Sequence, residues 1–391
     1  MDADFLVVGG GIGGAVLAEL LGRGGRKVLV LEKSAAPPQW VRPEILWPAT
    51  IEVLFSLSPR DAWEQEAILP LRGLELHDGR RVLTFFSPEL LEQLQIQPWS
   101  TDPNRTREHL LRLGSFELRR GVEVTEAVKE GSRVVGVRAR EVATGQAREF
   151  RARWTIGDDG PNSVVRKACQ IELKARMFPF DFLCFDLVWP SSLLPDTGRV
   201  WLNAQRSSPG ILALLAVPLP RGRGAGLVAA RPRIFDDLAR ATESWKRFCV
   251  QDAAIQQVIG ARQFPQDFVR VRRPWGHAPR YGTEGALLLG DAAHPVSPAG
   301  GQGANMSVAD ACVVADVVGR QATNLLAEYE RRRRPANHRS LLFTRVAVAV
   351  FGLPAWCATP IGRIALRQAL RGSWLRRRFL RAASTAFQER H

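Results

Sequence analysis

Two short apolar runs flank a helical pattern at the start of the chain. Residues 5–8 and 28–31 are uncharged and rich in branched side chains, which is typical of strands buried on both faces. Between them, a glycine-rich turn leads into residues 15–21, whose apolar positions follow helical spacing. The pattern predicts a strand–helix–strand unit, which is the first unit of a doubly wound parallel sheet.

A different pattern occupies the middle of the chain. Residues 73–86 alternate between apolar and polar positions around Asp78-Gly79, which predicts a hairpin. From about residue 171 to 270, strand-like runs are separated by proline and glycine turns, which predicts a mostly antiparallel sheet. Residues 336–391 mix apolar side chains with arginine and predict appended helices. The fold class is therefore α/β, with a doubly wound domain, an inserted β-sheet domain and C-terminal helices.

The charge balance of the chain is strongly basic. The net charge is +15, and arginine supplies 48 of the 54 cationic side chains. Solvated arginines on many faces would explain this, and so would a dedicated basic surface. No recognition motif accompanies the charge, so we expect no nucleic-acid partner. Anionic ligands stay open, and so does peripheral membrane contact through the basic C-terminal helices.

The cysteines and the apolar segments point to a reducing compartment. The five cysteines are scattered without a C-x-x-C pair, which argues against a disulfide framework and a metal site. The first predicted strand begins almost at the N-terminus, so we expect no export signal and a cytoplasmic protein. The longest apolar stretch, residues 341–361, is interrupted by Arg345, Pro354 and Pro360, so no spanning helix is expected.

A Gly9-x-Gly11-x-x-Gly14 motif fills the turn between the first predicted strand and helix. Gly9 allows the tight turn, Gly11 lets backbone N–H groups approach a pyrophosphate, and Gly14 lets the helix pack closely on the strand. Glu32 ends the second strand, where its carboxylate can accept hydrogen bonds from ribose hydroxyls. This order of elements predicts a dinucleotide site, and the motif alone fits FAD and NAD equally well.

Two later stretches carry the motifs that distinguish the dinucleotides. In residues 155–168 a strand end leads to Asp159-Gly160, and in residues 285–318 a buried strand leads to Gly290-Asp291, a glycine-rich loop and a long helix. Together with the first motif, they resemble the three fingerprints of the class A flavoprotein monooxygenases. That family comprises the para-hydroxybenzoate hydroxylase-like, FAD-dependent aromatic hydroxylases. The resemblance covers residues 1 to about 335 in order and spacing.

This resemblance and simple chemistry give roles to the motif residues. Asp291, at a strand end, can accept hydrogen bonds from the ribityl hydroxyls of FAD. The loop from Pro298 directly precedes a helix, whose N-terminal dipole suits the N1–C2=O region of a reduced flavin. By resemblance, Pro298 lies beside the reactive C4a edge, and Asp159 touches FAD and affects the use of the nicotinamide cofactor. A turn or helix cap is the alternative for both aspartates. The predicted cofactor-binding residues are Gly9, Gly11, Gly13, Gly14, Glu32, Lys33, Arg42, Arg107, Asp159, Gly160, Gly290, Asp291, Pro298, Gly301, Gln302, Gly303, Ala304 and Asn305.

Two arginines and one histidine are further candidates. The resemblance places Arg42 near the pyrophosphate or the nicotinamide cofactor, and Arg107 at the FAD phosphates, which a guanidinium suits geometrically. In a chain so rich in arginine, a surface position is the alternative for either. For His294, we favour a structural or flavin-edge role over that of a catalytic base. Pro298, His294 and Arg42 are the residues predicted to act at the reacting centre.

The resemblance also implies a division into domains. Residues 1–72, 99–170 and 271–335 are predicted to form the FAD-binding domain. Residues 73–98 and 171–270 are predicted to form the substrate domain, with 336–391 as a C-terminal helical region.

The implied activity is that of a single-component monooxygenase. NAD(P)H reduces FAD and leaves, and the reduced flavin and O₂ form a C4a-hydroperoxyflavin that hydroxylates, or epoxidises, the substrate. The apolar roof strands and the basic tail predict a lipophilic aromatic substrate of the quinolone or polyketide type. An FAD-dependent reductase of isoprenoid or lipid double bonds is one alternative, and a non-catalytic flavoprotein is the other.

Overall fold

The computed structural model describes residues 1–78, 81–203, 210–298, 300–351 and 373–389. The strand–helix–strand start is β1 (Ala3–Val8), α1 (Ile12–Arg23) and β2 (Val28–Glu32), as the apolar pattern predicted. β1 lies in the middle of the first sheet and pairs in parallel with both β2 and β11 (Ala147–Gly157).

Within the described residues, the first sheet has eight strands. β2 pairs in parallel with β8 (Glu117–Arg120), and β11 pairs in parallel with β20 (Ala286–Leu288), which pairs with β19 (Gly282–Thr283). A hairpin of β9 (Val122–Glu130) and β10 (Arg133–Glu141) adds antiparallel strands to β11.

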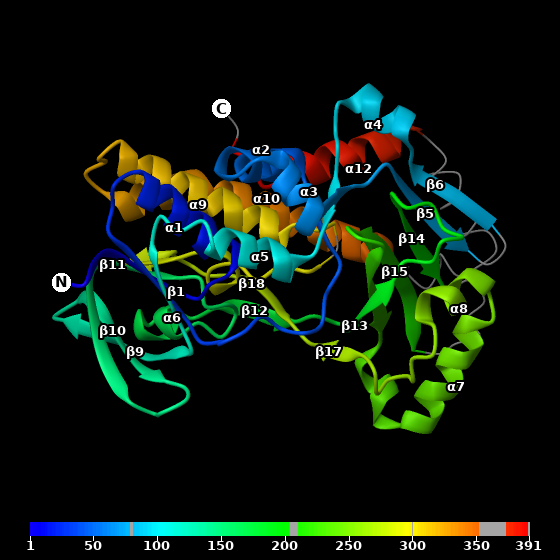
Figure 1. The fold of residues 1–391 in the computed structure, drawn as a ribbon, viewed down its shortest axis with the longest axis horizontal. Helices are drawn as coiled ribbons and strands as arrows, with labels where there is room; N and C mark the ends of the chain where they lie inside the picture. Colours follow the sequence, from blue (N-terminus) through cyan, green and yellow to red (C-terminus); the bar gives the residue numbers. More distant parts are fainter. Residues whose placement is uncertain (79–80, 204–209, 299, 352–372, 390–391) are drawn as a thin grey trace.

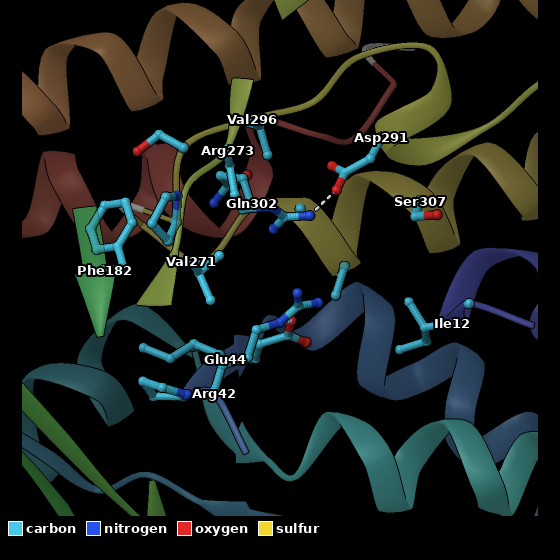
Figure 2. Close-up of a pocket in the computed structure, with 18 of the residues that line it drawn as sticks. Ile12, Arg42, Glu44, Phe182, Val271, Arg273, Asp291, Val296, Gln302 and Ser307 are labelled. Atoms are coloured by element: carbon cyan, nitrogen blue, oxygen red, sulfur yellow. Dashed lines mark hydrogen bonds and ion pairs between the residues drawn. The ribbon is translucent and has the colours of Figure 1, made fainter. Parts of the chain in front are cut away.

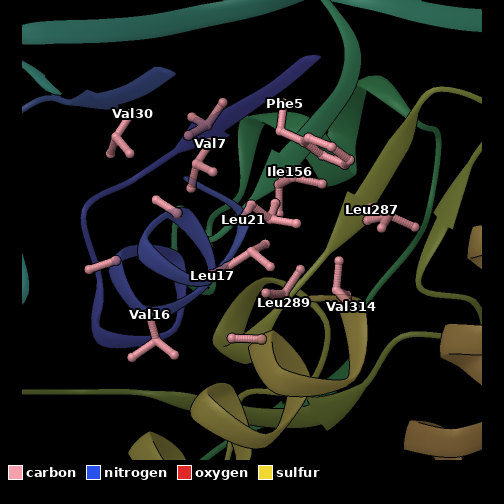
Figure 3. Close-up of a cluster of buried hydrophobic side chains, with 14 of the residues drawn as sticks. Phe5, Val7, Val16, Leu17, Leu21, Val30, Ile156, Leu287, Leu289 and Val314 are labelled. Carbon is pink, nitrogen blue, oxygen red and sulfur yellow. The ribbon is translucent and has the colours of Figure 1, made fainter. Parts of the chain in front are cut away.

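One face of this sheet is packed against α1 and α9 (Gly303–Gly319), and α10 (Leu325–Phe351) packs on α9 (Figure 1). The core between strands and helices is mainly apolar and includes Val7, Leu17, Ile156 and Val314, all nearly inaccessible to solvent (Figure 3). Burial of apolar surface stabilises the fold by about 25 cal/mol per Å². This packing holds the carboxyl ends of the parallel strands in fixed positions.

A second sheet of seven strands lies at the other end of the molecule (Figure 1). It contains the predicted hairpin, β5 (Gly73–Asp78) and β6 (Arg81–Phe86), which joins the later strands through a parallel pairing of β5 with β14. All its other strand pairs are antiparallel. The later strands are β13 (Asp181–Val188), β14 (Thr197–Leu202), β15 (Ile211–Leu219), β16 (Arg223–Ala230) and β17 (Val269–Val271).

Two helices that the sequence analysis did not anticipate cover the second sheet. They are α7 (Leu238–Cys249) and α8 (Ala253–Ile259), preceded by a 3-10 turn at Pro232–Asp236. Trp245 and Phe248 of α7 pack with Phe264 and Trp201 in a separate core. The predicted α/β class with an inserted, mostly antiparallel sheet is confirmed. The aromatic residues of the second sheet lie largely in the hydrophobic core.

Smaller elements connect the two sheets. β3 (Glu44–Leu46), β4 (Ile68–Pro70) and β7 (Trp99–Thr101) form one three-stranded sheet, and β12 (Lys174–Met177) pairs with β18 (Pro274–His277). The remaining elements are α2 (Pro48–Leu57), α3 (Arg60–Glu66), α4 (Pro88–Leu94), α5 (Pro103–Leu111), α6 (Val164–Ala168), a 3-10 turn η2 (Gly290–Ala292) and α12 (Ser373–Thr385).

The basic C-terminal helix packs against the body of the protein. Arg376 donates a hydrogen bond to the carbonyl of Thr84 (2.8 Å), and Arg377 bonds Gln93. α10 begins at Leu325 and crosses the predicted domain boundary at 335 as one continuous helix. Among the described helices, none is long and apolar enough to cross a membrane. In the part of the chain that the structure describes, nothing supports the predicted peripheral membrane contact.

Candidate active site

A cavity lies where the loops after β1, β11 and β20 meet the second sheet. Figure 2 shows Ile12 and Ser307 at one end and Phe182 at the other, with Arg42 and Glu44 facing Arg273 and Asp291 across it. The cavity is lined by Gly11, Ile12, Arg42, Pro43, Glu44, Ile45, Asp158, Gly160, Phe182, Cys184, Leu227, Val271, Arg273, Asp291, Val296, Ser297, Pro298, Gly301, Gln302, Gly303, Ala304 and Ser307. The structure thus brings the three sequence motifs together at one site.

The first glycine motif forms the tight entry to α1. Gly9 has φ +98°, and a Cβ there would collide with the carbonyl of Asp158. Gly13 faces α9 so closely that a Cβ would collide with Ser307, and a Cβ on Gly14 would lie 2.8 Å from the carbonyl oxygen of Gly9. Gly11 is the N-cap and offers no side-chain acceptor, so the end of α1 presents backbone N–H groups at the cavity.

Glu32 lies beside this turn, as a ribose-binding acid requires. Its side chain is buried, and its Oε2 accepts a hydrogen bond from the N–H of Gly10 (2.7 Å) while Oε1 accepts one from Ser34 (2.7 Å). Lys33, in contrast, is 66% exposed in its side chain and pairs with Glu123 at 2.6 Å. Lys33 does not line the cavity, and its predicted cofactor contact gains no support from this position.

The two aspartates after β11 point to different partners. Asp159 Oδ2 accepts hydrogen bonds from the N–H groups of Val164 (2.6 Å) and Val165 (3.3 Å), so it caps α6, the alternative that the sequence analysis left open. Gly160, with φ +78°, lines the cavity. Asp158, which the sequence analysis did not single out, also lines the cavity and accepts a hydrogen bond from the N–H of Gly14.

Four charged side chains face one another across the middle of the cavity. Asp291 forms an ion pair with Arg273, a residue that sequence reasoning missed. Arg42 pairs with Glu44 at 2.5 Å, and the carboxylate of Glu44 raises the pKa of Arg42 despite the opposing effect of burial. Each cation thus has an acid partner, and Asp291 lies at the cavity wall, where a ligand hydroxyl can reach it.

The loop before α9 is held in place by amide side chains. Asn305 Oδ1 accepts a hydrogen bond from the N–H of Trp47 (2.9 Å), and Asn305 Nδ2 donates to the carbonyl of Gly301 (2.6 Å). Gln302 Nε2 donates to Gly300 (3.0 Å) and to Ala383 of α12 (2.9 Å). Pro298, Gly301, Gln302, Gly303 and Ala304 line the cavity, and no side chain caps the N-terminus of α9. The first turn of α9 is therefore directed at the cavity, as predicted.

His294 lies behind this loop and not at the cavity. It is 1% exposed, and its Nε2 is 2.6 Å from Asp310 Oδ2. Asp310 also accepts a hydrogen bond from Arg333 Nε (2.7 Å) and one from the N–H of Gly290 (3.1 Å). Although burial opposes it, His294 and Arg333 hold the pKa of Asp310 below its usual range. This placement fits the structural role considered for His294 and gives no support to its predicted action at the reacting centre.

Arg107 offers a buried donor near the first glycine motif. It lies on α5, one helical turn before Leu111, whose Cδ1 would be 3.3 Å from a Cβ on Gly10. Its Nη2 bonds Glu108 at 3.2 Å, while its Nε is buried and makes no hydrogen bond. A buried guanidinium N–H without a protein partner suits an anionic ligand group. Together with the glycine turns and the helix N-termini directed at the cavity, it makes the site fit FAD.

The comparison with protein families decides which group this chain joins. The model of an FAD binding domain matches residues 2–344. The chain belongs to this FAD-binding family. The match confirms the family resemblance that the three motifs indicated.

Relatives of known activity agree with this assignment. The chain is 29% identical over 385 residues to a 6-methylpretetramide 4-monooxygenase of Streptomyces rimosus, covering 88% of this chain and 82% of the relative. It is 29% identical over 364 residues to a rifampicin monooxygenase of Streptomyces venezuelae, covering 88% and 71%. Its fold resembles the crystal structure of p-nitrophenol 4-monooxygenase from Pseudomonas putida, with a TM-score of 0.77 at 20% identity over 100% of this chain and 99% of that one.

Proposed function

We propose that this chain is a single-component FAD-dependent monooxygenase that uses NAD(P)H and O₂ to oxygenate a bulky, lipophilic aromatic substrate. The observation that supports this most is the construction of the cavity. One end is built from the helix N-termini and acids that suit a dinucleotide, and the other end is built from the second sheet.

The cofactor end is assigned residue by residue. Glu32 would hold a ribose, Arg107 and the N-terminus of α1 the phosphates, and Asp291 the ribityl chain. Pro298, Gly301 and Gln302 would face the flavin ring together with the N-terminus of α9. When bound, the flavin supplies the electron transfer and the activation of O₂, and the protein orients it and excludes water.

The substrate end of the cavity is apolar. Phe182 and Cys184 of β13, Leu227 of β16 and Val271 of β17 line it from the second sheet. Burial raises the pKa of the Cys184 thiol to about 12, so it stays neutral and acts as an apolar wall. Such a wall favours a lipophilic ring system, and two relatives are named for polycyclic substrates. We infer a substrate of the polyketide or quinolone type.

A single assay separates this function from its alternatives. Purified protein with bound FAD is mixed with NADH or NADPH in air, with and without a polycyclic phenolic substrate. We expect the substrate to stimulate NAD(P)H oxidation and to gain one oxygen atom, detected by mass spectrometry. Hydrogen peroxide as the sole product would contradict the proposal, and so would turnover restricted to small hydroxybenzoates. Saturation of an isoprenoid double bond would indicate the reductase, and no stimulated oxidation at all would indicate the non-catalytic flavoprotein.

A further inference from the structure

Asp158 lies where the three motif-bearing loops meet. Its Oδ2 accepts a hydrogen bond from the N–H of Gly14 in the first turn of α1 (2.7 Å). Its Oδ1 is 3.4 Å from Ser307 Oγ of α9, and a Cβ on Gly290 would come 3.0 Å from the same oxygen. One carboxylate thus contacts the first glycine motif and α9, and borders the turn before Asp291.

The space beside Gly11 decides how closely a pyrophosphate can approach the N-terminus of α1. In the dinucleotide motif this glycine is small so that a pyrophosphate can approach the helix end. Here, a Cβ on Gly11 would come within 2.5 Å of Asp158 Oδ2, because the carboxylate stands beside the glycine. Since Gly11 has no side chain to cap α1, Asp158 accepts a first-turn N–H in its place. An anion of the protein therefore already lies at the helix N-terminus where the phosphates are expected.

The surroundings disfavour a second negative charge. Burial raises the pKa of Asp158 well above its ordinary range, and the negative charges of Asp291 and Asp159 raise it further. The N–H of Gly14 and the hydroxyl of Ser307 oppose this effect. The two cations that line the cavity are matched by acids, in the pairs Arg273–Asp291 and Arg42–Glu44. The cavity thus has no cation left over to balance Asp158.

We propose that the Asp158 carboxylate and the FAD pyrophosphate compete for the N-terminus of α1, so that FAD binds to the form in which Asp158 carries a proton. Where Asp158 is ionised in the free protein, binding then takes up one proton from solvent for each FAD bound. The affinity for FAD falls as the pH rises, by up to about tenfold per pH unit once Asp158 is ionised in the free protein. Asp158 thereby sets the affinity of this chain for its cofactor.

The experiment measures FAD binding against pH. The full-length protein is stripped of FAD and titrated with FAD at about pH 6, about pH 7 and about pH 8.5, following flavin fluorescence. Wild type is compared with Asp158→Asn, which keeps an acceptor for the Gly14 N–H, and with Asp186→Asn, a matched loss of charge at an exposed position on β13. We expect the wild-type Kd to rise towards the high end of this pH range and the Asp158→Asn Kd to stay nearly constant. The Asp186→Asn protein should follow wild type.

A second readout counts protons directly. Calorimetry of FAD binding in buffers of different ionisation enthalpy should show proton uptake by wild type and none by Asp158→Asn. If that variant does not fold, Asp158→Ala takes its place. Parallel pH curves, or weaker binding by the variant at every pH, would overturn the proposal and leave Asp158 as a helix cap. Failure of every form to bind FAD at every pH would overturn both this proposal and the proposed function, whereas pH-independent binding would overturn this proposal alone.

Discussion

Individual buried residues behind the cavity form one connected polar network. His294 and Arg333 meet on the carboxylate of Asp310, and Asn337 Nδ2 links Asp310 (3.1 Å) to the hydroxyl of Tyr281 (3.2 Å). Since Asp310 also holds the N–H of Gly290, the network fixes the turn that presents the residue after it, Asp291. A carboxylate that is fully hydrogen-bonded in this way tolerates burial, whereas loss of one partner leaves an unbalanced charge.

His277 borders this network and gives a pH-dependent prediction. Burial lowers the pKa of His277 to about 3, and the positive charges of His294, Arg334 and His338 contribute. The unfolded chain therefore binds a proton at this residue below about pH 6.5 while the folded protein does not, so stability falls as the pH drops from there towards the folded value. We expect His277→Asn to flatten this fall, measured by urea unfolding between about pH 7 and about pH 4. Equal pH slopes for the two proteins would show that His277 does not titrate in this way.

At the scale of elements, the approach of α1 to α9 sets the geometry of the cofactor end. Gly13 and Ser307 meet across the two helices with no room for a Cβ on the glycine. The cavity needs this contact because α1 and α9 both direct their N-termini at it. Gly13 is therefore required by helix packing, whereas the motif assigns the approach of the phosphates to Gly11.

The contact between α1 and α9 is testable with a pair of glycine substitutions. Gly13→Ala should destabilise the protein by about 1–3 kcal/mol and weaken FAD binding, because α1 must move away from Ser307. Gly319→Ala, at the other end of α9, has nothing within 4 Å of the added Cβ and should be neutral or slightly stabilising. Thermal unfolding and FAD titration check both. Equal effects of the two substitutions would contradict the packing argument.

At the scale of the whole molecule, each end of the cavity has its own apolar core, and a smaller core with Leu76, Phe85, Met306 and Leu341 joins the second sheet to α9 and α10. Of the two larger cores, one lies between the first sheet and α1 and α9, and the other lies between the second sheet and α7 and α8. Four charged residues that line the cavity, Arg42, Glu44, Arg273 and Asp291, lie outside the two larger cores. Because each end has its own core, a substitution in one core can increase local unfolding at that end more than at the other.

Hydrogen exchange measured by mass spectrometry would reveal this separation. Phe248→Ala removes a fully buried ring from α7 and should cost about 3–5 kcal/mol in the second core. We expect faster exchange in β13–β16 and little change in β1, β2 and β11. Leu17→Ala in α1 is the matched substitution in the first core and should give the opposite pattern. Uniform acceleration across both sheets would mean that the molecule opens as one unit.

Much of the fold and of the cofactor end could be predicted from the sequence. The backbone conformation of a turn or a helix start depends mainly on the residues of that segment itself. Gly9 adopts a positive φ, which its residue type already indicates. The glycine-rich loop before α9 can likewise be identified from its own residues, without knowledge of what it contacts. The helices α7 and α8 were missed although Asp237 and Asp252 cap them, since turn signals were read as strand boundaries. The directions of Asp158 and Arg273 could not be read from the sequence, because side chains at strand ends take partners from other loops.

The interleaving of the chain has a consequence for biosynthesis. β5 is made early but pairs with β14, and β1 pairs with β11, which in turn pairs with β20. Each sheet therefore needs segments separated by over a hundred residues. Neither sheet can close around its early strands while the ribosome is still making the middle of the polypeptide. The last wall of the flavin site, the start of α9 at Gly303, emerges after both sheets are encoded. The complete flavin site can therefore form only after the residue at the start of α9, Gly303, has been made.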